Sequence, residues 1–175
     1  MDKYQETFST WNKIADIYQD KFMDLDLYNS SYDAFLKKLN KKNATVLEIG
    51  CGPGNISKYL LSKNKQLSIT GIDISDNMIQ LARANNPMAK YELMDIRNLA
   101  NIPNKYDAIV CGFSIPYLSK TDCKKLITDC YQLLNNEGIM YLSFVEGDYE
   151  KSGFVTGSSG DRVFFYYHNW DTLKV

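Results

Sequence analysis

Residues 45–55 read TVLEIGCGPGN, a short apolar run that ends in three closely spaced glycines. Val46, Leu47 and Ile49 suit a strand that is covered on both faces, and Glu48 is the one charged residue among them. The glycines allow backbone torsions that other residues avoid, and they let a ligand approach the main chain where a Cβ would block it. The segment predicts a buried strand that runs into a tight turn at a nucleotide-type site. A glycine turn without a ligand is the alternative.

Two residues of this turn separate two kinds of cofactor site. The dinucleotide fingerprint Gly-x-Gly-x-x-Gly needs a small residue where this chain has Asn55, and Pro53 has no N–H to direct at a pyrophosphate. An acid followed by Gly-x-Gly-x-Gly instead resembles the first motif of the class I S-adenosylmethionine-dependent methyltransferases. The resemblance implies S-adenosyl-L-methionine as the cofactor. That molecule carries no phosphate, and nearby carboxylates such as Glu48 would offset its positive charges.

The composition is that of an ordinary globular domain. The chain has 175 residues, of which 45% are hydrophobic, with a formal net charge of −1 and a pI near 5.8. This length predicts one domain, and a chain without a large basic block is not expected to bind nucleic acid or a membrane. The polar amino terminus and the lack of a long apolar run predict a cytoplasmic protein. Four cysteines without a Cys-x-x-Cys pair suggest neither a metal site nor a disulfide framework.

Strand and helix patterns alternate along the middle of the chain, and residues 44–147 are expected to form one α/β core. The expected strands are 45–49, 67–73, 90–94, 106–111 and 139–145, and the expected helices are 56–61, 75–84 and about 121–134. A turn at 135–138 precedes the last strand. This alternation predicts right-handed crossovers and a doubly wound, mostly parallel, Rossmann-like sheet that binds ligands at the carboxyl ends of its strands.

Aromatic and apolar residues recur at helical spacing before the first strand. They predict two helices, one over about 8–22 and one over about 28–39. In proteins that this chain resembles, such helices fold over the cofactor, so residues 1–43 are expected to form a helical lid in which Trp11 and Tyr18 face the ligand. Packing of an amphipathic helix into a core explains the same two residues about as well.

Acidic residues end two of the expected strands. Asp73 follows Gly50 by 23 residues, close to the offset of about 20 at which a strand-end carboxylate binds a ribose diol in nucleotide folds. An acid ahead of the helix-capping Ser75 is the alternative interpretation. Asp95 and Ile96 resemble the methyltransferase adenine site, where an acid accepts from the exocyclic amine and the next backbone N–H donates to the ring.

The resemblance extends from about residue 45 to residue 145 and implies a complete cofactor site. Its expected members are Glu48, Gly50, Cys51, Gly52, Asp73, Ile74, Met78, Asp95, Ile96 and Cys111. The loop after the fourth strand reads GFSIPY at 112–117, which departs from the Asn/Asp-Pro-Pro-Tyr/Phe signature of enzymes that methylate base or protein amines. A small-molecule acceptor is therefore expected.

The acceptor pocket is expected at five residues, Trp11, Tyr18, Phe113, Tyr117 and His168. A base is needed only if the acceptor arrives protonated. His168 is the only histidine, and its reference pKa of about 6.5 suits that task, with Tyr117 as an alternative. Because a solvent-facing strand histidine is the simpler interpretation, no catalytic residue is assigned.

The end of the chain, residues 148–175, carries different signals. Two strand-like segments, 154–156 and 163–168, flank a Gly-Ser-Ser-Gly turn and predict a hairpin or flap, and Asn169 is expected to cap a final helix. The resembled fold has two more strands after that helix, so this chain is expected to lack the last two strands of the sheet. Residues 154–167 are then expected either to pack on the fifth-strand side or to pair with another copy in a homodimer.

The leading hypothesis is an S-adenosylmethionine-dependent methyltransferase that acts on a small molecule. Three alternatives stay open at this point. The chain could bind the cofactor without turnover, it could be an NAD(P)-dependent oxidoreductase, which Pro53 and Asn55 disfavour, or it could transfer another group of the cofactor, such as aminopropyl.

Overall fold

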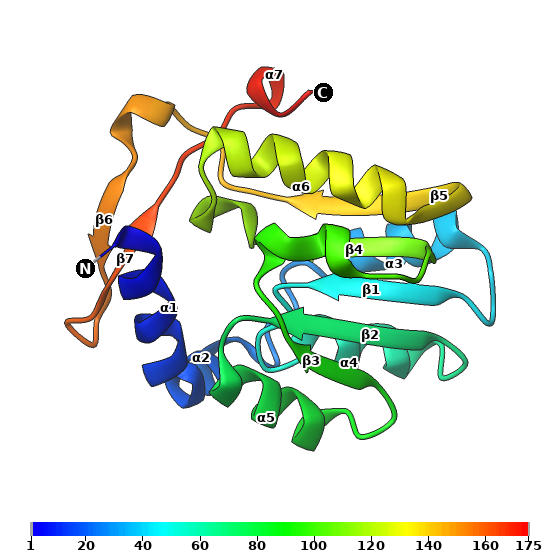
Figure 1. Ribbon diagram of the computed structural model, residues 1–175. Helices are drawn as coiled ribbons and strands as arrows, with labels where there is room; N and C mark the ends of the chain where they lie inside the picture. The colour runs from blue at the N-terminus through cyan, green and yellow to red at the C-terminus, as the bar shows by residue number, and fades with distance from the viewer. Residues whose placement is uncertain (1, 175) are drawn as a thin grey trace.

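The computed structural model describes residues 2–174, which contain a sheet of five parallel strands (Figure 1). The strands are β1 Thr45–Ile49, β2 Ser68–Asp73, β3 Lys90–Leu93, β4 Tyr106–Gly112 and β5 Leu134–Ser143. They lie in the order β3-β2-β1-β4-β5, with the glycine-ended strand β1 in the middle. This order confirms the predicted doubly wound, Rossmann-like α/β sheet.

Helices cover both faces of the sheet. They are α1 Lys3–Lys13, α2 Ala15–Phe22, α3 Asn29–Leu39, α4 Asn55–Lys63, α5 Asp76–Asn85 and α6 Lys120–Leu133, with the 3-10 segments η1 Ile96–Asn101, η2 Ile115–Tyr117 and η3 Tyr149–Lys151. Helices α3 and α4 pack on one face, whereas α6 and η1 pack on the other. Within residues 2–174, no helix is long and apolar enough to cross a membrane.

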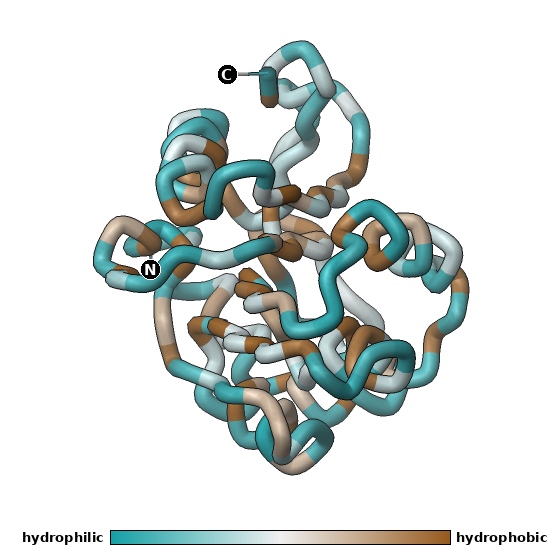
Figure 2. The backbone as a smooth tube through the Cα atoms, turned by 90° about the vertical axis from the view of Figure 1, so that its right-hand side faces the viewer, coloured by the Kyte–Doolittle hydropathy of each residue, from teal (hydrophilic) through white to brown (hydrophobic). Residues whose placement is uncertain are grey.

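The core follows from the alternation of side chains along β1. Val46 is fully buried in a cluster with Phe35 and Leu60, while its neighbour Leu47 is fully buried in a second cluster with Leu126. Both faces of the strand are therefore buried, as the hydrophobic run predicted. Figure 2 shows the hydrophobic stretches gathered mainly towards the middle of the molecule, with hydrophilic turns outside.

The amino-terminal segment forms two helices where the sequence predicted one over about 8–22. Helix α1 ends and α2 begins at Ile14, whose φ of −98° and ψ of 17° depart from helical values. Backbone hydrogen bonds still join Ile14 N to Thr10 O and Tyr18 N to Ile14 O, at 3.0 and 2.9 Å. The helical hydrogen bonding therefore continues through the bend. Both helices lie beyond the carboxyl ends of the strands (Figure 1).

Strand β5 differs from the prediction at its start. The sequence predicted a turn at 135–138 before the strand, but β5 already pairs with β4 at Leu134 and resumes regular pairing at Ile139. The intervening residues form a bulge in which Glu137 takes a φ of 63°. The turn residues are therefore an irregularity inside the strand, since β5 pairs with β4 both before and after them.

The carboxyl-terminal segment contains the predicted hairpin and the predicted final helix. Strands β6 Gly153–Thr156 and β7 Arg162–Phe165 pair antiparallel, and α7 Trp170–Leu173 begins at Asn169, whose Oδ1 accepts from Thr172 N at 2.9 Å. The expectation that this hairpin packs on the fifth-strand side of the same chain is wrong.

The hairpin packs on α1 instead. The Thr10 hydroxyl donates to Arg162 O at 2.8 Å, and Phe164 N donates to the Thr7 hydroxyl at 2.9 Å. Glu6 forms an ion pair with Arg162. The two threonines pair with backbone groups of β7 and the ion pair adds a side-chain contact, so the hairpin is held on the side of the amino-terminal helices. Pairing of two copies in a homodimer stays a prediction.

Candidate functional site

The turn after β1 holds glycines in left-handed torsions. Gly50, Gly52 and Gly54 have φ values of 63°, 52° and 82°, which other residues rarely adopt. A Cβ on Gly50 would lie 2.0 Å from Ser114 Oγ, whereas a Cβ on Gly52 would meet only a ring carbon of Tyr18, at 3.7 Å. Packing therefore requires a glycine at position 50, while the space beside Gly52 is open as far as the Tyr18 ring.

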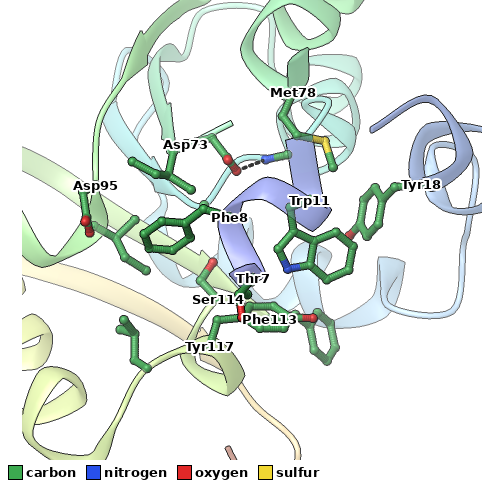
Figure 3. Close-up of a pocket in the computed structure, with 16 residues that line it drawn as sticks. Thr7, Phe8, Trp11, Tyr18, Asp73, Met78, Asp95, Phe113, Ser114 and Tyr117 are labelled. Atoms are coloured by element: carbon green, nitrogen blue, oxygen red, sulfur yellow. Dashed lines mark hydrogen bonds between the residues drawn. The ribbon is translucent and has the colours of Figure 1, made fainter. Parts of the chain in front are cut away.

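A cavity of about 120 Å³ lies between this turn and the amino-terminal helices (Figure 3). A single water needs only about 10–15 Å³, so the cavity is large enough for part of an organic ligand. It lies beyond the carboxyl ends of the strands, where open α/β sheets bind their ligands. Most of the expected site residues line it, namely Gly50, Gly52, Asp73, Ile74, Met78, Asp95, Ile96, Trp11, Tyr18, Phe113 and Tyr117.

Asp73 lies ahead of the cap of α5, as the alternative interpretation expected, and it also lines the cavity. Its Oδ2 accepts from Gly52 N and its Oδ1 accepts from Ser75 N, each at 2.9 Å, so it braces the glycine turn and precedes the cap of α5. A carboxylate has about four lone-pair sites on its two oxygens. The carboxylate, which lines the cavity, thus keeps acceptor capacity for a ligand. Burial raises the pKa of Asp73, and the hydrogen bonds from Ser75 and Gly52 oppose that shift.

Asp95 is held by its neighbour Arg97. The guanidinium Nε lies 3.0 and 2.9 Å from the two carboxylate oxygens, and Arg97 N donates to Oδ1 at 2.9 Å. The guanidinium carbon in turn lies 4.3 Å from the centre of the Tyr4 ring and 5.4 Å from that of Phe8. Because α1 carries both rings, the expected adenine acid is linked to α1 through this arginine.

Three of the expected cofactor residues do not line the cavity. Glu48, Cys51 and Cys111 are buried beneath it. The Ser57 hydroxyl donates to Glu48 Oε2, and Oε1 has no hydrogen-bond partner within residues 2–174. Burial raises the pKa of Glu48 to about 8, against the opposing hydrogen bond from Ser57. This carboxyl is therefore mostly protonated at neutral pH.

His168 is neither in the cavity nor in solvent. It is fully buried, with Nε2 lying 3.1 Å from Leu118 O and 3.6 Å from Cys123 Sγ. Burial lowers the pKa of its imidazole. The sequence suggested a pocket residue or a solvent-facing strand residue, but the ring lies in the core beside Leu118. The backbone there forms an isolated bridge between residues 146 and 168.

Five lining residues were not predicted, namely Thr7, Phe8, Gly112, Ser114 and Leu118. Phe8 belongs to the same helical pattern as Trp11 and lies one turn earlier on α1, so the lid interpretation could have included it. Ser114 had no signal of its own. Its hydroxyl donates to Ile49 O at 3.0 Å, and this contact becomes visible only once β1 and β4 are known to be neighbours.

Comparison with known proteins gives consistent matches. Residues 46–138 match the model of a family described as methyltransferase domain. The putative methyltransferase 235L of Invertebrate iridescent virus 6 is 37% identical over 113 residues, which cover 64% of this chain and 40% of the viral protein. The malonyl-[acyl-carrier protein] O-methyltransferase of Priestia megaterium is 28% identical over 179 residues, which cover 92% of this chain and 62% of that enzyme. The chain thus spans between 40% and 62% of the length of these curated relatives.

Solved structures share the fold. The DhpI-SAM-HEP complex aligns with a TM-score of 0.74 at 19% identity, over 97% of this chain and 84% of that one. An S-adenosylmethionine-dependent methyltransferase from Clostridium acetobutylicum aligns with a TM-score of 0.63 at 25% identity, over 85% of this chain and 65% of that one.

Proposed function

Because the chain belongs to the methyltransferase-domain family, we propose that it binds S-adenosyl-L-methionine in the cavity beside the glycine turn and transfers the methyl group to a small-molecule acceptor. One observation carries the proposal. The cavity gathers the open backbone at Gly52, the carboxylate of Asp73 and the Asp95–Ile96 pair at the carboxyl ends of the strands.

The lining residues suggest where each part of the cofactor would lie. The free lone pairs of Asp73 suit the ribose diol, since a carboxylate accepts two charge-assisted hydrogen bonds from adjacent hydroxyls. Asp95 and Ile96 line the same cavity and mark the proposed adenine position, where the adenine amine would share the Asp95 carboxylate with Arg97. The methionine end would then lie along the glycine turn, where a side chain on Gly52 would be in its way.

The chemistry asks little of the protein beyond positioning. A nucleophilic atom of the acceptor forms a bond to the methyl carbon, the bond from that carbon to the sulfonium sulfur breaks, and its electron pair stays on sulfur to give S-adenosylhomocysteine. Any proton on the acceptor atom passes to water. Alignment of acceptor and methyl group alone can lower the barrier by roughly 7–11 kcal/mol. This chemistry therefore needs no histidine base, and His168 does not line the cavity.

Two measurements on the same preparation test the proposal. Calorimetry with S-adenosylmethionine asks whether the cofactor binds, and a methyl-release assay across phenols, amines and acids asks whether it turns over. Binding with release supports the methyltransferase. Binding without release would favour a cofactor-binding domain, and binding of reduced nicotinamide cofactor in place of S-adenosylmethionine would favour the oxidoreductase.

A further inference from the structure

The wall of the cavity that faces away from the strand-end carboxylates is aromatic. Helices α1 and α2 contribute Trp11 and Tyr18, and the segment after β4 contributes Tyr117 (Figure 3). The centre of the Trp11 ring lies 5.6 Å from that of Tyr18 and 5.3 Å from that of Tyr117, and the angles between the ring planes are 89° and 73°. Such edge-to-face contacts fix the rings against one another. The acceptor side of the cavity is thus a rigid set of flat, apolar surfaces.

Phe113 adds a strained residue to this wall. Its φ is 57°, in the left-handed region where a bulky side chain is a genuine outlier. The conformation is held by a hydrogen bond from Phe113 N to Ser143 Oγ at 3.0 Å and by the ring of Tyr28, whose centre lies 4.8 Å away. A glycine would adopt this torsion without strain. Strained residues of this kind cluster at ligand sites, so we infer that the Phe113 ring contacts a ligand.

The polar groups of the aromatic wall are neutral hydrogen-bond donors. The indole Nε1 of Trp11 is buried and has no hydrogen-bond partner within residues 2–174. It is directed towards the side of the cavity where Phe113 and Tyr117 lie (Figure 3). A buried N–H without a partner is costly, and a ligand oxygen would satisfy it. Burial raises the pKa of Tyr18 to about 12 and raises that of Tyr117 as well, so both phenols stay protonated.

The charges of the cavity argue against an anionic acceptor. Among its lining residues the only charged side chains are Asp73 and Asp95, and no lysine, arginine or histidine is present to receive a carboxylate. Arg97 is close by, but it is engaged by Asp95. A polycarboxylate would therefore meet like charge and apolar rings, which disfavours its binding.

We propose that the acceptor is an uncharged, planar aromatic or conjugated molecule whose oxygen accepts a hydrogen bond from Trp11 Nε1, with Phe113 and Tyr117 against its ring. This inference rests on the proposed function. Flat apolar walls select a flat molecule, the buried indole N–H selects an oxygen, and the absence of a lining cation selects against carboxylates.

Calorimetry on the chain saturated with S-adenosylhomocysteine tests this specificity. The probes are 2-naphthol, which is neutral, planar and hydroxylated, and trans-aconitate, which is a tricarboxylate. We expect saturable binding of 2-naphthol and none of trans-aconitate at the same concentration. Tighter binding of trans-aconitate, or no binding of 2-naphthol, would overturn the inference. Failure of S-adenosylhomocysteine itself to bind would overturn the proposed function instead.

Two variants locate the probe. Trp11→Phe keeps an aromatic ring but removes the N–H together with one ring of the indole, so it should weaken 2-naphthol binding by at least about three- to tenfold, the loss expected for one hydrogen bond. Trp170→Phe is the matched control, because Trp170 lies on α7, half exposed and outside the cavity lining, and it should leave the affinity unchanged. If Trp11→Phe and Trp170→Phe bind 2-naphthol with equal affinity, 2-naphthol does not contact Trp11 and the proposed role of Trp11 is refuted. Circular dichroism and S-adenosylhomocysteine affinity check that each variant is folded.

Discussion

Substitution of Gly52 by alanine distinguishes two reasons for a glycine at this position, its left-handed torsion and the space that it leaves for a ligand. Its φ of 52° costs an alanine about 1–2 kcal/mol. The new Cβ would have no steric cost within the chain, since only a Tyr18 ring carbon lies within 4 Å, at 3.7 Å. In a chain of this length each kcal/mol lowers the Tm by about 2–4 °C. We therefore expect Gly52→Ala to lose about 2–8 °C and to remain folded.

The effect on the cofactor should be larger than the effect on folding. The methyl group of the alanine would project into the space between the turn and Tyr18, where the methionine end of the cofactor is proposed to lie. We expect S-adenosylhomocysteine to bind at least about tenfold more weakly, a difference of ~1.4 kcal/mol. Calorimetry gives the affinity, and scanning fluorimetry without ligand gives the Tm.

Gly160→Ala is the matched control for backbone strain. Gly160 has a φ of 81°, and a Cβ there would meet nothing within 4 Å. It lies in the turn between β6 and β7, outside the cavity lining. Gly160→Ala should lower the Tm by a similar amount and should bind S-adenosylhomocysteine as tightly as the natural chain. If both variants bind the cofactor as the natural chain does, the glycine turn is only structural and the proposed position of the methionine end is incorrect.

Three further perturbations have defined outcomes. Burial raises the pKa of Glu48 from 4.5 to about 8, so between these pH values the folded chain holds a proton that the unfolded chain has released. The free energy of unfolding should therefore fall as pH rises through this interval. Urea titrations should show a weaker dependence of this free energy on pH in Glu48→Gln. Tyr4→Phe removes the hydroxyl that donates to Asp122 and accepts from Ser119 N, so it should cost about 1–3 kcal/mol in urea unfolding, and an unchanged midpoint would show that this contact does not hold α1. Amide exchange measured by mass spectrometry should be faster along β5, which pairs on one side only, than along β1, which pairs on both; equal protection would indicate a covered edge, as in the predicted homodimer.

The sheet and most of the site could be predicted because they depend on local patterns. The apolar run before Gly50 specifies a strand buried on both faces, and the strand-end rule places Asp73 and Asp95 at one edge whatever the details of packing. The family prediction is confirmed by the match over residues 46–138. The cytoplasmic location and the homodimer stay predictions.

The remainder depended on tertiary contacts that no local pattern specifies. The bend at Ile14, which sets α2 at an angle to α1, has no proline or glycine to signal it. The hairpin could have covered β5, but hydrogen bonds to Thr7 and Thr10 fix it on α1. His168 resembles a pocket base in sequence and is a buried core residue in the fold, beside Leu118 O, a contact between residues 50 positions apart that no local pattern specifies.

The most direct test of S-adenosylmethionine binding at this cavity is calorimetry of the natural chain and of Asp73→Ala with S-adenosylhomocysteine. Each hydrogen bond from a ribose hydroxyl to the carboxylate contributes ~1.5–3 kcal/mol, so the variant should bind at least about tenfold more weakly. Asp73→Asn keeps an oxygen for Gly52 N or Ser75 N and serves as the control for the stability of the turn. One-to-one binding by the natural chain with this loss in Asp73→Ala is the predicted result. Equal affinity of the two chains, or no binding by the natural chain, would contradict the proposed cofactor site.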